Sequence, residues 1–306
     1  MTTQPEITLK SWLMVATLGF VWGASFLFIE IALEDITPFW LAGLRIILAA
    51  LLTTAIWKLR GGKLYLTDEN AGAVPVFAIS AMSTALPFMA ISWGQQFVTS
   101  GFAGVSMAAV GLIVLPLAHV FVPGEHMTVR KVVGFLIGFA GVAVLIGPDA
   151  FGSSGIVGEF SGRIACLFGA VCYAVSSVML RRLPPVDPIG LSAITLIVGG
   201  AMTVMLAFAF EGMPSMPTVK VLGVIIVLGL FQTAAANLLR IMVVRSAGPT
   251  FMSLTNYQVP VWSVVLGVVI LGEALPPSLL VALALILAGV ALSQWGALRR
   301  LFFRAN

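Results

Sequence analysis

Charge is scarce in this chain, because only 9% of its 306 residues are Asp, Glu, Lys or Arg. A soluble domain carries roughly 25% charged residues, so the composition excludes an ordinary soluble protein. Cysteine is scarcer still: Cys166 and Cys172 lie six apart in one apolar run and point to different faces, which predicts neither a disulfide nor a metal site. No residues follow metal-ligand spacing, and no phosphate-binding Gly-rich loop with Lys-Ser/Thr is present. We therefore predict no metal, no cofactor and no ATP site within the chain.

Long apolar segments take the place of charge. Hydrophobic residues make up 60% of the chain and the mean hydropathy is +1.10. The runs are continuous rather than alternating, which excludes barrel strands and favours helices of roughly 20 residues, long enough to span a bilayer. The sequence predicts an all-α membrane protein with ten transmembrane helices near residues 11–33, 38–57, 73–95, 100–122, 131–147, 160–180, 188–210, 219–243, 249–271 and 276–298.

The basic residues indicate how these helices are oriented. If the N-terminus is inside, the inner loops and helix ends collect thirteen Lys and Arg residues, whereas the outer side collects only Arg163 and Lys220. This excess satisfies the positive-inside rule and predicts that both termini are cytoplasmic. We expect a multi-pass protein of the inner (plasma) membrane. The basic charge is thus explained by topology, and no nucleic-acid partner is predicted.

Two short motifs recur at one fixed spacing. Gly124-Glu125 recurs as Gly272-Glu273, and Ala140–Ala143 recurs as Ala288–Ala291, both 148 residues later. We interpret residues 1–150 and 151–306 as two copies of a five-helix unit. An odd number of crossings per copy inverts the second copy in the membrane. Inverted repeats are typical of secondary transporters, which hold substrate near the midplane between the copies.

Two charges are predicted to lie within the first two spans. Glu30 is near the outer end of the first, and Arg45 is about a third of the way into the second. Their axial offset is roughly 7 Å at 1.5 Å per residue, which an arginine side chain can cover. An unpaired charge there is costly, so we expect a Glu30–Arg45 pair. It could act as a gate or substrate contact, or be purely structural; alternatively, Glu30 could reach the outer headgroups.

Polar and aromatic side chains also gather in several spans. Pro260 frees a backbone carbonyl beside three consecutive polar residues, and such groups are expensive in lipid unless they face protein or water. One interpretation is a central cavity with a polar and an aromatic lining; the other is ordinary hydrogen bonding between helices, with the prolines as simple kinks. The candidate substrate-binding residues are Trp22, Ser25, Trp93, Tyr173, Gln232, Asn237, Asn256, Tyr257, Gln258 and Trp262, and the candidate hinges are Pro87, Pro116 and Pro260.

At these residues the chain resembles the EamA branch of the drug/metabolite transporter superfamily. The matching features are Trp22–Phe26, Arg45, Ala90, the two Gly-Glu turns and Pro260. The chain departs from the family pattern at Leu112, where proline is common. Within the family it is most similar to YddG-type exporters of aromatic and other amino acids. The resemblance implies ten helices, alternating access, and a cavity lined by helices 1, 3, 4, 6, 8 and 9.

We therefore predict a secondary transporter that exports amino acids, of aromatic and other apolar types, or similar small metabolites. Its partners would be the small-molecule substrate and the lipid bilayer, and no protein partner is predicted. The alternative is an exporter of drugs, nucleosides or lipophilic cations. An enzyme acting on lipid would need a nucleophile or metal cluster, and a receptor or scaffold would leave the duplication unexplained. The sequence leaves open whether protons drive transport.

Overall fold

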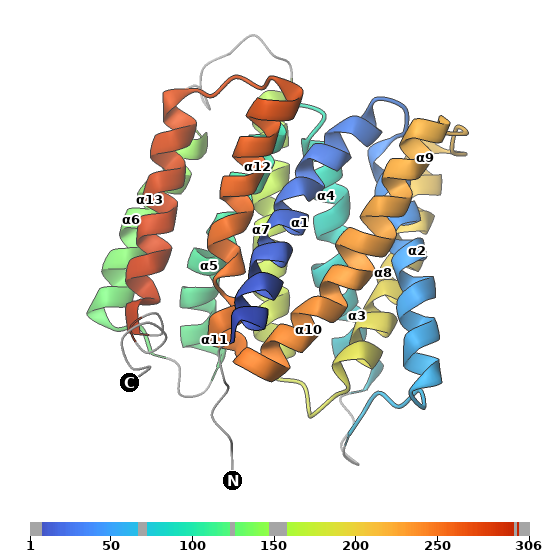
Figure 1. The fold of residues 1–306 in the computed structure, drawn as a ribbon, viewed down its shortest axis with the longest axis horizontal. Coiled ribbons are helices and arrows are strands. Elements are labelled where there is room, and N and C mark those ends of the chain that lie inside the picture. The colour runs from blue at the N-terminus through green and yellow to red at the C-terminus, as the bar shows by residue number, and fades with distance from the viewer. Residues whose placement is uncertain (1–7, 67–71, 123–125, 147–157, 297–298, 300–306) are drawn as a thin grey trace.

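Helices make up the fold in the computed structural model, which describes residues 8–66, 72–122, 126–146, 158–296 and 299 (Figure 1). Eight helical segments are long and apolar enough to span a membrane, and α12 and α13 are shorter apolar helices of 17 residues each. The described ranges contain no strand beyond an isolated bridge between Tyr65 and Val186. The ten predicted helices are thus confirmed within these ranges.

The first five crossings are α1 (Leu9–Leu33), α2 (Pro38–Leu59), a third built from α3 (Ala73–Ser80), η1 (Ala81–Ala85) and α4 (Leu86–Gly94), then α5 (Ser100–Phe121) and α6 (Val129–Ile146). The next five are α7 (Glu159–Leu180), α8 (Pro188–Glu211), an eighth built from α9 (Val219–Ile226), η3 (Val227–Ala235) and α10 (Ala236–Ala247), then α11 (Pro249–Met252) with α12 (Thr255–Leu271), and α13 (Pro277–Ser293).

The helix bounds repeat along the chain in a way that agrees with a two-repeat fold. Adding 148 to the bounds of α6 gives 277–294, and α13 spans Pro277–Ser293. The same shift moves α1 to 157–181, where α7 spans Glu159–Leu180. Because α1 is the first crossing and α7 the sixth, these two helices run in opposite directions. Figure 1 shows the start of α1 and the end of α13 at one end of the bundle, here called the lower end, opposite the upper end. Which end faces the cytoplasm stays a prediction.

Glycines allow α6 and α13 to approach closely. A Cβ atom at Gly134 would lie 2.6 Å from the Gly289 carbonyl oxygen, and one at Gly289 would lie 2.5 Å from the Gly134 oxygen and from the Gly138 nitrogen. Small residues of this kind are typical of helix contacts in membranes. Because lipid supplies no hydrophobic driving force between helices, their association depends on close van der Waals packing. These two crossings, the fifth of each half, therefore pack backbone against backbone.

The third crossing of each half contains a π-helical segment. The two segments, η1 and η3, are equivalent, because adding 148 to the bounds of η1 gives 229–233, inside η3. In η3 the Thr233 hydroxyl donates to the Leu228 carbonyl, five residues earlier, at 2.8 Å. Such wide turns are rare and frequently occur at functional sites. Both segments lie in mid-crossing, where a transporter would bind its substrate.

At the upper end, acidic side chains tie the two halves together. Glu211, at the end of α8, accepts hydrogen bonds from the first turn of α2: the Phe39 N–H at 3.0 Å, the Trp40 N–H at 3.1 Å and the Thr37 hydroxyl at 2.6 Å. Asp35, between α1 and α2, accepts from the Thr218 N–H at the start of α9. Hydrogen bonds from Thr218 lower the pKa of Asp35 below its ordinary value.

The Glu211 contacts give the first prediction. Replacing Glu211 with Ala should lower the free energy of unfolding by about 1–2 kcal/mol, because it leaves the first N–H groups of α2 without their acceptor. Glu34→Ala is the matched control, since the Glu34–Lys220 pair is exposed and such pairs contribute little. Thermal unfolding in detergent measures both variants, and equal midpoints would contradict the capping role of Glu211.

Candidate functional site

Arg45 is a buried cation in the interior of the bundle. It lies on α2 and is only 5% exposed. One guanidinium nitrogen, Nη2, donates to the Thr233 hydroxyl at 3.2 Å, the guanidinium carbon lies 4.6 Å from the centre of the Phe88 ring, and Nε is buried without a hydrogen-bond partner. Within the described part of the chain no carboxylate comes within 4.0 Å of this group. Arg45 therefore presents an uncompensated positive charge where charge is expensive.

Both helix breaks contribute to the surroundings of Arg45. Phe88 follows η1 by three residues, and Thr233 belongs to η3. Tyr173, on α7, is close enough to Arg45 for the two groups to interact electrostatically. The guanidinium thus lies where segments of both halves meet, as expected of a site between two repeats.

Two further polar groups in the interior lack partners. The Gln232 side chain is 5% exposed, and its amide oxygen is buried without a hydrogen-bond donor. The Tyr257 hydroxyl, on α12, is likewise buried and unpaired. Buried polar atoms are normally hydrogen-bonded, so these two, with Arg45 Nε, are groups able to bind a polar ligand. Gln232 and Tyr257 were both predicted as site residues.

The remaining predicted residues on α1, α7 and α10 have various surroundings. Trp22 and Tyr173 are half-buried and pack against the main hydrophobic core. Ser25 is buried and donates to the Val21 carbonyl of its own helix at 3.3 Å. Asn237 is engaged with protein groups: its amide nitrogen donates to the Ser192 hydroxyl, and its oxygen accepts from Arg240 at 3.2 Å.

On α12 the predicted residues fall on different faces. Gln258 and Trp262 are one turn apart and fill the gaps opposite two glycines of α1, since Cβ atoms at Gly19 and Gly23 would lie 2.6 and 2.4 Å from them. The Trp262 ring makes an edge contact with Phe20 at 5.2 Å between centroids, and both rings are exposed at the bundle surface. Asn256 is exposed near the lower end of α12.

Trp93 and the predicted hinges lie along three crossings. Trp93 is near the upper end of α4 and packs on Phe97, with centroids 4.9 Å apart. Pro87 is the second residue of α4, just after η1, whereas Pro116 and Pro260 lie inside α5 and α12, which continue past them. A π-helical segment beside a proline is a recognised cause of helix kinks, so Pro87 is the strongest of the three hinge candidates.

Glu30 and Arg45 do not pair in this structure. Glu30 accepts a hydrogen bond from the Gln95 amide at 3.4 Å, while Arg45 donates to Thr233. The predicted ion pair is therefore not formed in this conformation. The physical reason is rotation about the helix axes: the axial offset is short enough, but the two side chains point toward different neighbours. A gating role for either residue stays a proposal.

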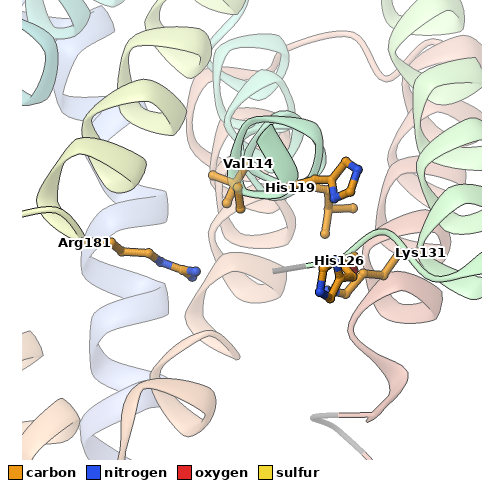
Figure 2. Close-up of a pocket in the computed structure, with 7 residues that line it drawn as sticks. Val114, His119, His126, Lys131 and Arg181 are labelled. Carbon is orange, nitrogen blue, oxygen red and sulfur yellow. The ribbon is translucent and has the colours of Figure 1, made fainter. Parts of the chain in front are cut away.

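A cavity of about 60 Å³ lies at the lower end, between α5, α6 and α7. Figure 2 shows Arg181 extending toward this cavity from one side. His119 of α5, His126 and Lys131 lie on the other side. Its lining residues are Val114, Leu115, Ala118, His119, His126, Lys131 and Arg181, none of which belongs to the predicted set. Small-molecule sites usually measure roughly 300–1,000 Å³, so this cavity is too small for one.

Sequence reasoning missed several of the residues around these groups. Thr233 and Phe88 contact Arg45, and Gln95 bonds to Glu30, but none has a sequence signal beyond polarity or aromatic character. Glu273 accepts from the Ser100 and Gly101 N–H groups of α5, at 2.7 and 3.0 Å, and this long-range contact has no sequence signal either. Gly272 ends α12 in a left-handed conformation, and Gly124 and Glu125 lie outside the described residues.

Similar proteins are described as transporters. The chain is 24% identical over 295 residues to the uncharacterized transporter YoaV of Bacillus subtilis, covering 95% of this chain and 99% of that one. It is 28% identical to the uncharacterized inner membrane transporter YedA of Escherichia coli K12, covering 91% and 89%. A Chlamydia trachomatis S-adenosylmethionine/S-adenosylhomocysteine transporter is 23% identical, covering 90% and 86%. The narrower resemblance to YddG-type exporters receives no support from these relatives.

Fold and family agree. A solved crystal structure superposes with a TM-score of 0.66 at 22% identity, covering 95% of this chain and 99% of that one, which shows the fold. The profile of the EamA-like transporter family matches residues 9–147 and again residues 160–295. These matches and the apolar helices make the protein a multi-pass transporter of the inner membrane. The chain belongs to the EamA-like transporter family.

Proposed function

We propose that this transporter exports amino acids or similar small carboxylate-bearing metabolites by alternating access between two inverted repeats, residues 1–150 and 151–306. The observation that carries the proposal is the charge of Arg45, which is buried and has no carboxylate partner within the described residues. A substrate carboxylate would supply the missing counter-ion in a geometry that guanidinium groups bind well.

Other groups in the interior fit the rest of such a substrate. The Gln232 amide oxygen can accept a hydrogen bond from an α-ammonium group, and the Tyr257 hydroxyl can donate or accept one. Trp22 and Tyr173 offer aromatic surface for an apolar or aromatic side chain. Six more residues stay in the proposed substrate-binding set, but with less support, because they contact protein groups or lie nearer the surface. They are Ser25, Trp93, Asn237, Asn256, Gln258 and Trp262.

The Chlamydia trachomatis relative supports the same chemistry. The substrates in its name, S-adenosylmethionine and S-adenosylhomocysteine, are amino-acid derivatives that carry a carboxylate and an ammonium group. The rival substrate class, lipophilic cations, would meet the buried positive charge of Arg45 and be repelled by it. Drugs or nucleosides without an anionic group would leave that charge uncompensated.

Competition for uptake tests this proposal. The purified protein is reconstituted into liposomes preloaded with phenylalanine, and counterflow of labelled phenylalanine is measured with a panel of unlabelled competitors. We expect amino acids to compete and their carboxamides to fail, because the amides lack the carboxylate that would pair with Arg45. Competition by phenylalanine amide equal to that by phenylalanine, or by nucleosides alone, would contradict the proposal.

A further inference from the structure

Near the upper end, α1, α5 and α12 meet through small residues. A Cβ atom at Gly104 of α5 would lie 1.8 Å from the Ser263 hydroxyl of α12 and 3.3 Å from the Phe26 ring of α1. One helical turn closer to the upper end, the corresponding positions are Glu30 on α1, Gly101 on α5 and Gly267 on α12. Glu30 is therefore placed at a junction between helices of the two halves.

Glu273 reaches the same junction from the second half. Its two oxygens accept from the Ser100 and Gly101 N–H groups at 2.7 and 3.0 Å, and it lies beside Gly267, where an added Cβ would be 2.3 Å from Oε2. Glu30 and Glu273 are close enough to interact electrostatically. Because both Glu273 oxygens already accept hydrogen bonds from N–H groups, Glu30 is the candidate carboxyl group for proton binding at this junction.

Gln95 completes this group of side chains. It is 2% exposed, and its amide nitrogen donates to the Phe26 carbonyl at 3.0 Å and to Glu30 Oε2 at 3.4 Å. Its amide oxygen is buried without a hydrogen-bond donor. A protonated Glu30 carries an O–H group that could donate a hydrogen bond to this oxygen or to the Glu273 carboxylate, whereas an ionised Glu30 has no proton to donate.

The other charged groups near this junction are accounted for. Glu34, one turn further along α1, pairs with Lys220 of α9 at 2.7 Å, and Arg163 of α7 pairs with Glu159 and lies over the Phe102 ring. The basic residues of α10 are near the lower end, and Arg45 of α2 is engaged with Thr233. Within the described residues no cation pairs with Glu30, which leaves its charge to be balanced by a proton.

We propose that Glu30, with Gln95 and Glu273, forms a proton-binding site whose occupation couples proton entry to substrate export. A proton suits this site better than a metal cation, because an N–H donor already points at Glu30 and both Glu273 oxygens accept from N–H groups. Proton binding at Glu30 removes the repulsion between the two carboxylates and lets α1, α5 and Glu273 close together. Ionisation restores the repulsion and favours parting of the halves at the upper end. The coupling role rests on the proposed transport function.

Infrared spectroscopy tests the site without any substrate. The full-length protein in lipid nanodiscs is titrated between about pH 5 and about pH 8, a range in which carboxyl groups inside proteins can titrate. The readout is the C=O stretch of protonated carboxylic acids. We expect a titrating band in the wild type that is lost in Glu30→Gln and kept in Glu34→Gln, its exposed control. Gln95→Leu should shift its frequency. Should Glu30→Gln fold poorly, Glu30→Asp should keep a band with a changed midpoint.

Other results of the infrared titration would contradict a proton-binding site at Glu30. A band that persists unchanged in Glu30→Gln assigns the proton elsewhere, and a wild type without a titrating band excludes the site. Loss of the band on adding sodium at constant pH would favour a metal cation over a proton. A second assay uses a pH gradient across the liposomes: one-to-one coupling should accumulate phenylalanine about tenfold per pH unit, and Glu30→Gln should abolish accumulation.

The two assays separate this site from the proposed function. A band that depends on Glu30 in a protein that does not move phenylalanine would overturn amino-acid transport and leave the proton site standing. Phenylalanine counterflow in a protein without the band would overturn the proton site alone.

Discussion

Replacing Arg45 with Met should strongly reduce amino-acid counterflow while leaving the protein as stable as the wild type, or more stable. A hydrogen bond to a charged group contributes about 1.5–3 kcal/mol, so loss of the guanidinium should weaken carboxylate binding by roughly tenfold to more than a hundredfold. Stability should not fall, because the variant removes a buried charge that has no carboxylate partner in the described chain.

Two further variants separate binding from structure. Arg45→Lys keeps the charge but loses the planar donor pair, so partial activity is expected. Thr233→Val removes the hydroxyl that accepts from Arg45 and should weaken transport less than Arg45→Met does. Counterflow and thermal midpoints are measured on the same preparations. A structural role for Arg45 would instead lower the midpoint of Arg45→Met in step with its activity, and that result would remove it from the site.

Replacing Gly289 with Val should prevent stable folding, and Gly289→Ala should show an intermediate defect. An added Cβ would lie 2.5 Å from Gly138 N and 2.7 Å from Gly138 Cα, and these atoms belong to backbone that cannot rotate away. Overpacking of this kind typically costs about 1–3 kcal/mol and sometimes more. The contact joins α6 to α13, so the added side chain should disrupt the packing between the fifth crossings of the two halves.

Gly223 provides the matched control for this prediction. It lies in α9 and has no heavy atom within 4 Å of an added Cβ, so Gly223→Ala should be tolerated. The fraction of monodisperse protein after heating in detergent, measured by size-exclusion chromatography, compares the variants. Equal survival of Gly289→Val and Gly223→Ala would show that α6 and α13 do not pack as closely as described.

The transmembrane helices could be predicted from the hydrophobicity of the sequence, because lipid allows few alternatives to a helix. The breaks within them were only partly predictable. Pro87 marks the end of η1, but no proline accompanies η3, where Gly229 and Thr233 are ordinary residues for a membrane helix. The equivalence of the two breaks becomes visible only when the spacing of 148 is applied to the observed backbone.

The candidate site was less predictable because partners depend on rotation and on distant segments. Spacing along the chain brought Glu30 and Arg45 to similar depth, yet Gln95 and Thr233 are their neighbours. The hydrogen-bond donors of Glu273 come from α5, which is far away in sequence, so no local pattern indicates them. Polarity suggested an inward role for Gln258, but that side chain fits against Gly19 between α1 and α12.

The most direct test of the account is the orientation of the two halves. His126, before α6, and Ala274, before α13, are equivalent at the spacing of 148, and both are exposed. Single cysteines at these positions are labelled in intact cells with a membrane-impermeant maleimide; Cys166 and Cys172 are buried and can be retained. We expect Ala274→Cys to react from outside and His126→Cys to react only after the membrane is opened. Reaction of both cysteines from the same side would contradict the inverted arrangement and, with it, the proposed site between the halves.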